Sequence, residues 1–168
     1  MPYFLRAIYS NIHWEKTRFP SWLQEGDLPS CIIMDLRADD NALSLWEISD
    51  DESNLLDIVA AFVSLRKDIK YDFDYALLSA NHLDELSFTP SKKPAKTAYR
   101  DMNRYHRNVS NLSLNNVVYF AHLLSRHGKF DRMAWKDIEA RLKEAYTKGQ
   151  LDLQRMEPTL RKQLGIPK

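Results

Sequence analysis

Glycine is scarce in this chain, which has four glycines among 168 residues, all isolated from one another. Phosphate-binding loops need clustered glycines so that several backbone N–H groups can approach one phosphate, and no such signature is present. Gly128, Gly149 and Gly165 each follow a run with helical spacing. We expect these three glycines to end helices.

Cysteine is rarer still. The single Cys31 cannot form an intramolecular disulfide or anchor a thiolate zinc site, which favours a reducing compartment such as the cytoplasm. The five histidines form no His-x-x-x-His pair, and no Gly-x-Ser-x-Gly turn is present to expose a serine. From the sequence we therefore assign no catalytic residue, no metal ligand and no cofactor.

Long hydrophobic runs are also missing. None approaches the roughly 20 apolar residues that span a membrane, and the apolar stretch Met1–Trp14 is interrupted by Arg6 and lacks a small-residue cleavage site. We expect a soluble protein with no membrane contact. With 168 residues, 44% of them hydrophobic and 28% charged, the chain has the size and composition of one globular domain.

Charge is unevenly distributed along the chain, although the net charge is +1. Residues 25–85 contain fifteen Asp or Glu and four Lys or Arg, a balance of −11. Residues 86–168 contain seven Asp or Glu and seventeen Lys or Arg, a balance of +10. Such segregation indicates either two halves that pack on each other or two faces that meet different partners.

The acidic first part, residues 1–86, has patterns of both strands and helices. Tyr3–Tyr9, Leu43–Ile48 and Phe73–Leu78 are predicted to be strands, because they combine aromatic, β-branched and other apolar residues over short runs. Cys31–Arg37, preceded by Ser30 as a cap, is predicted to be a short helix, and a buried strand is the alternative.

A longer helix is predicted between the last two of these strands. The apolar residues from Leu55 to Val63 recur with helical spacing, Ser49-x-x-Glu52 matches a capping box, and Arg66 lies at the negative end of the helix dipole. A connection of this length is typical of parallel strands. We therefore expect Leu43–Ile48 and Phe73–Leu78 to form a parallel pair.

The second part of the chain is predicted to contain no strand. Residues 87–98, rich in proline and lysine, are predicted to be a linker or mobile loop, and residues 99–168 to be a basic helical half with helices that begin near Ser113, Asp131 and Pro158. The expected class is α+β: a mixed N-terminal half with a small sheet and a capped amphipathic helix, then an all-helical C-terminal half. The two halves are expected to pack as one domain.

Basic and aromatic side chains gather just after the change of charge sign. This basic stretch contains Lys92, Lys93, Lys96, Tyr99, Arg100, Arg104, Tyr105, His106 and Arg107. Its cations are suited to bind phosphates, and its rings to stack on unpaired bases. Two alternatives are a solvated surface and docking against the acidic half of the same chain.

Two patterns typical of nucleases have little weight. A spaced Arg–His pair is the short motif of a helical ribonuclease class, and Arg100 with His106 has such a spacing, but twelve arginines and five histidines yield about one such pair by chance. Asp57 followed by Asp68-Ile69-Lys70 has the order of restriction-type metal ligands. Both acids belong to one predicted helix, whereas that chemistry needs ligands that project together from a rigid sheet.

These observations favour a non-enzymatic intracellular protein that binds another macromolecule. A protein partner or self-association, through the helical half or the charged faces, is the leading hypothesis. A nucleic-acid binder that uses residues 92–107 is the first alternative, and a nuclease or other hydrolase is the second.

Overall fold

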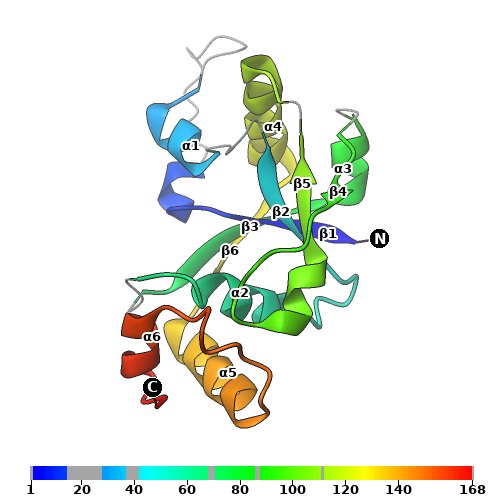
Figure 1. Cartoon of the computed structure of the whole chain (residues 1–168). Helices are drawn as coiled ribbons and strands as arrows, with labels where there is room; N and C mark the ends of the chain where they lie inside the picture. The colour runs from blue at the N-terminus through cyan, green and yellow to red at the C-terminus, as the bar shows by residue number, and fades with distance from the viewer. Residues whose placement is uncertain are drawn as a thin grey trace.

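The computed structural model describes residues 2–14, 28–36, 42–67, 71–85, 88–110 and 112–167. Through them runs a six-stranded sheet with the order β4-β5-β2-β1-β3-β6, in which all neighbouring strands are antiparallel (Figure 1). The strands are β1 (Tyr3–Ala7), β2 (Leu43–Ile48), β3 (Phe73–Ser79), β4 (Ser91–Lys92), β5 (His106–Val109) and β6 (Lys129–Met133). The first strand of the chain is thus an interior strand.

Helices cover both faces of the sheet (Figure 1). One face carries α2 (Leu55–Val63), α5 (Trp135–Thr147), α6 (Pro158–Gln163) and the 3-10 helix η3 (Arg100–Tyr105). The other carries α1 (Ser30–Asp35), α3 (Ala80–Glu85), α4 (Leu114–His127) and the 3-10 helix η1 (Asn11–Trp14). Leu5 belongs to the first core and its neighbour Phe4 to the second, as the alternation of side chains along a strand requires.

The all-helical C-terminal half expected from the sequence is wrong, because β5 and β6 lie within it. β5 reads His-Arg-Asn-Val and β6 reads Lys-Phe-Asp-Arg-Met, so neither has the alternating, β-branched pattern that indicates a strand. Pairing with the apolar strands β2 and β3 makes them strands: His106 lies opposite Trp46, and Lys129 opposite Leu77. Charged residues are common on an edge strand such as β6.

The expected parallel pair is also wrong. β2 and β3 run in the same direction, but β1 lies between them and is antiparallel to both. Tyr3 is opposite Ile48 on one side and Ser79 on the other. The segment between β2 and β3 is long enough for a crossover connection between adjacent parallel strands. Nothing in its sequence indicates that β1 lies between β2 and β3.

Helix starts were harder to predict than helix ends. The expected capping box does not form: Glu52 has a positive φ of 56°, and α2 begins after Asn54. α1 begins at Ser30 itself without a side-chain cap, and Asp131 lies in β6 rather than at the start of α5. The helix that begins after Ser113 is confirmed, since the Ser113 hydroxyl accepts a hydrogen bond from the Asn116 N–H, and Pro158 begins α6.

All three expected helix-ending glycines follow helices. Gly128 directly follows α4, and Gly149 and Gly165 have positive φ values of 68° and 69° just beyond α5 and α6. Positive φ is the conformation in which glycine has no steric penalty, so the predicted ends of these two helices have a clear physical basis.

The described part of the connecting segment, residues 88–98, contributes to both the sheet and the core. Its strand β4 pairs with β5, and beyond it Thr97 and Ala98 are buried. Thr97 binds Asn103 of η3 through its backbone N–H at 2.9 Å and its hydroxyl at 2.7 Å.

Among the described residues, four ion pairs join the acidic first half to the basic second half. Each basic partner comes from the region after residue 86, and each acidic partner from residues 25–85; the pairs are Arg107–Glu47, Lys129–Glu52, Arg132–Asp74 and Arg141–Asp57. The charge segregation of the sequence is therefore in part an internal complementarity. Across the described residues, no helix combines the length and apolar character that crossing a bilayer requires.

Candidate functional site

The basic stretch is divided between surface and interior. Lys92, Lys93, Lys96, Arg100 and Arg104 are exposed. The guanidinium of Arg100 pairs with Asp152 at 3.3 Å, and that of Arg104 lies 4.9 Å from the centre of the Tyr105 ring. The exposed cations thus lie in β4, in the segment after it and in η3. The ring of Tyr105 is already in contact with the Arg104 guanidinium.

The other members of the stretch hold the fold together. Tyr99 is 1% exposed, and its hydroxyl contacts Asp57, Gln150 and Arg141. Arg107 is buried and pairs with Glu47 on β2. These residues are not on one surface with the exposed lysines, so the structure does not assemble the stretch into a single platform for stacked bases.

His106 forms a bridge between β5, β2 and the segment after β4. Its Nδ1 lies 2.5 Å from the Lys93 carbonyl oxygen, so Nδ1 carries the proton, and Nε2 then accepts from the Ser44 hydroxyl at 2.5 Å. This arrangement has the geometry of a serine with its general base. However, Ser44 lies inside β2 and His106 inside β5, so we interpret the pair as a cross-strand structural link rather than as a nucleophile on an exposed turn.

The two nuclease-like patterns gain no support. Arg100 pairs with Asp152 and His106 with Ser44, and no contact joins Arg100 to His106 in the described part of the chain. Asp57 is engaged by Arg141, and Asp68-Ile69-Lys70 lies outside the described residues. Within the ranges described here, no group of three or more His, Cys, Asp or Glu side chains is placed to hold a metal ion.

A different site arises where two central strands diverge. β1 stops pairing with β2 at Leu5 and Trp46, although β1 continues beside β3 as far as Ala7. The Arg6 side chain occupies the opening: Nη1 donates to the Ser44 carbonyl at 2.9 Å, and Nη2 donates to the Asp35 carbonyl at 2.8 Å. Arg6 therefore connects the open end of the sheet to α1.

Asp35 directs the chain as it leaves β1. Its buried carboxylate accepts the Tyr9 N–H at 2.6 Å and the Trp14 indole N–H at 2.8 Å. With its backbone held in this way, Tyr9 keeps its ring in solvent, where it is 84% exposed.

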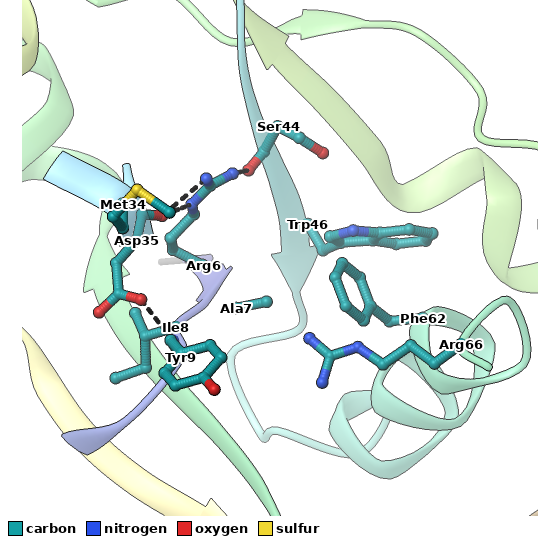
Figure 2. Close-up of a pocket in the computed structure, with 10 residues that line it drawn as sticks. All are labelled: Arg6, Ala7, Ile8, Tyr9, Met34, Asp35, Ser44, Trp46, Phe62 and Arg66. Carbon is teal, nitrogen blue, oxygen red and sulfur yellow. Dashed lines mark hydrogen bonds between the residues drawn. The ribbon is translucent and has the colours of Figure 1, made fainter. Parts of the chain in front are cut away.

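Two adjoining cavities form at this end, and together we call them the open-end hollow. The smaller has a volume of about 220 Å³ and is lined by residues that include Arg6, Tyr9, Met34, Trp46, Phe62 and Arg66 (Figure 2). The larger, of about 690 Å³, is lined by Tyr9, Ser10, Arg66, Tyr71, Asp72, Asp74 and Arg132. Tyr9 and Arg66 line both, so they form the boundary between the two.

Exposed apolar side chains line the hollow. Eight large apolar side chains are exposed among the described residues, and three of them, Tyr9, Met34 and Tyr71, line it. Ile33 and Leu65 directly precede the lining residues Met34 and Arg66 in the chain, whereas Leu114 and Tyr119 lie on α4. Single exposed apolar residues are ordinary, but a cluster of them at one concave place marks a contact surface.

The acidic groups of the hollow are already bound. Arg132 donates to both oxygens of Asp74, at 2.6 and 2.9 Å, and Asp72 accepts the Trp135 N–H at 3.0 Å. Arg66 differs, because no carboxylate in the described residues pairs with it. Its guanidinium lies instead 4.8 Å from the centre of the Phe62 ring and 5.0 Å from that of Phe73.

Sequence reasoning did not find this hollow. The sequence predicts Arg66 only as the cation at the end of a helix, and Tyr9 as the last residue of a strand that in fact ends at Ala7. The one available signal was the pair of tyrosines, Tyr9 and Tyr71, placed beside turn-forming residues rather than within an apolar pattern. Comparison with family models, curated proteins and solved structures found no match to this chain.

Proposed function

We propose that this chain is a non-enzymatic protein that binds another protein through the open-end hollow. The observation that carries the proposal is that three exposed apolar side chains, those of Tyr9, Met34 and Tyr71, line one concavity together with Arg66. Tyrosine, methionine and arginine are the side chains enriched at the energetic centre of protein interfaces. Tyr9, Tyr71, Met34 and Arg66 provide this composition.

The dimensions of the hollow favour a protein over a small cofactor. The smaller cavity, at about 220 Å³, is below the roughly 300–1,000 Å³ of typical small-molecule sites. The larger cavity, at about 690 Å³, is within that range, but the two tyrosine rings that border it, Tyr9 and Tyr71, are 84% and 77% exposed. A surface that offers a side-chain-sized cavity beside open aromatic rings suits a partner's surface better.

A site-specific photo-crosslink tests the proposal. The full chain carries a photoreactive phenylalanine derivative at position 71 in one sample and at position 119 in the other, since Tyr119 is also exposed but lies on α4. We expect one defined protein adduct from position 71 only, unchanged by nuclease and lost when Tyr9→Ala is added. An adduct with the mass of two copies identifies self-association. Equal products from both positions, or none from position 71, contradict the proposal.

Nucleic-acid binding is the second candidate. It is favoured by the exposure of Lys92, Lys93, Lys96 and Arg104, none of which forms an ion pair with a described residue. Binding through these cations would weaken steeply as salt is raised, because each phosphate contact releases counterions. A variant with glutamate at all four positions that keeps its affinity for single-stranded RNA excludes this candidate.

A further inference from the structure

Arg66 holds an unusual position at the boundary between the two cavities. It follows the end of α2, where its backbone N–H donates to the Val63 carbonyl at 2.9 Å. Figure 2 shows its side chain directed into the smaller cavity, beside Phe62 and facing Tyr9. The side chain therefore faces both spaces that a partner would fill.

The charge of Arg66 is not neutralised by the described residues. The two other arginines of the hollow are engaged: Arg6 donates to backbone carbonyls, and Arg132 pairs with Asp74. Partial removal from water lowers the pKa of Arg66, and the rings of Phe62 and Phe73 compensate only weakly for lost hydration. Arg66 is nevertheless an exposed residue, so an approaching anion can reach its guanidinium.

On the basis of the protein-binding function proposed above, we infer that the open-end hollow recognises an acidic residue of its partner, whose carboxylate pairs with Arg66 while an adjacent apolar side chain enters the smaller cavity. The planar guanidinium matches a carboxylate with two parallel hydrogen bonds. Trp46, Phe62 and Met34 supply the apolar wall for the neighbouring side chain.

A single carboxylate fits this surface better than a phosphate backbone. Asp72 and Asp74 line the larger cavity, and Asp74 already neutralises Arg132. A polyanion that crosses the hollow would meet these carboxylates and one available cation. An isolated acidic residue flanked by apolar ones meets Arg66 alone, so charge complementarity selects a short acidic and apolar peptide segment.

Selection from a phage library of random hexapeptides on the immobilised full chain tests this inference. We expect wild-type protein to enrich peptides in which Asp or Glu stands next to a large apolar residue. Arg66→Glu should no longer retain them, and its own selection should shift towards Lys or Arg. The matched control is Arg126→Glu, an exposed arginine on α4, which should enrich the same peptides as the wild type.

Synthetic versions of the enriched peptides then separate the possible failures. We expect Arg66→Gln to weaken binding by about 10- to 100-fold, and replacement of the peptide's Asp or Glu by its amide to do the same. Peptides that depend on Tyr9 and Tyr71 but bind Arg66→Gln equally well overturn the inference and leave the protein-binding proposal intact. If no enriched peptide depends on Tyr9 or Tyr71, both are wrong. Thermal melts of each variant verify that the fold is retained.

Discussion

Arg141 on α5 pairs with Asp57 on α2, and its Nη2 also donates to the hydroxyl of Tyr99 at 2.7 Å. The side chains of the pair are 16% and 20% exposed. The ion pair joins a helix of the acidic half to a helix of the basic half. The guanidinium carbon Cζ of Arg141 also lies 5.7 Å from the centre of the buried Tyr99 ring.

The first prediction concerns this pair. Asp57→Ala should lower the free energy of unfolding by about 2–4 kcal/mol, because it removes the carboxylate that a mostly buried guanidinium and the Tyr99 hydroxyl share and leaves them only Glu144 and Gln150. Glu144→Ala is the control, since Glu144 pairs with the same arginine from the solvent side of α5 and should have little effect. Urea unfolding of both variants measures the difference, and equal losses would show that burial of the pair is unimportant.

A second prediction concerns alkaline pH. Burial, and after it the negative charge of Asp57, raises the pKa of Tyr99 to about 12. Burial, and after it the negative charge of Asp131, raises the pKa of Tyr75 to about 12. Protonated tyrosine is thus favoured in the folded state, so this stability is present below the ordinary pKa of 10 and is lost as pH rises from 10 through 12. Tyr99→Phe and Tyr75→Phe should each flatten this decline in urea unfolding. A decline unchanged in the double variant contradicts the assignment.

A third prediction concerns the bridge between Ser44 and His106. Burial lowers the pKa of His106 below its ordinary 6.5. The folded state therefore disfavours the charged imidazole, and the stability is present above pH 6.5 and is lost as pH falls through the lowered pKa. His106→Gln should reduce the slope of unfolding free energy against pH in this window relative to the wild type. An unchanged slope would exclude His106 as the source.

A fourth prediction separates the two parts of the basic stretch. Arg107→Ala should cost about 2–4 kcal/mol of unfolding free energy, because the buried guanidinium binds Glu47 and also donates to the Arg104 and His106 carbonyls. Alanine at Lys92, Lys93, Lys96 or Arg104 should change it by about 0.5 kcal/mol or less. Thermal or urea unfolding of the five single variants checks this order, and a small effect at Arg107 would contradict its structural role.

Local patterns predicted some elements closely and others not at all. β2 was predicted with its observed bounds, and β3 to within one residue, because both have apolar side chains on two faces. β5 and β6 were missed because their polar sequences favour a strand only beside an apolar partner strand. The capping box failed because Asn54 binds back to the Ser49 N–H at 2.9 Å, which holds residues 50–53 in a turn and delays the helix.

The candidate site depends on contacts that sequence patterns do not encode. Arg66 and Tyr9 are 57 positions apart and meet only because β1 enters the sheet between β2 and β3. The basic stretch was visible in the sequence, but its division into exposed lysines and buried Tyr99 and Arg107 was not. Arg104 is exposed and Arg107 is buried, although they are three residues apart, because η3 directs the first to solvent and β5 directs the second to the core.

The sequence by itself determined the two apolar strands, the helix ends at Gly149 and Gly165, and the segregation of charge, since these depend on neighbouring residues or on composition. Only the tertiary structure decided the antiparallel strand order, the ion pairs that join the two halves, and the hollow at the open end of the sheet. The physical reason is that strand pairing and burial are interactions between distant segments. Their free energy exceeds the local preferences of polar sequences such as β5 and β6.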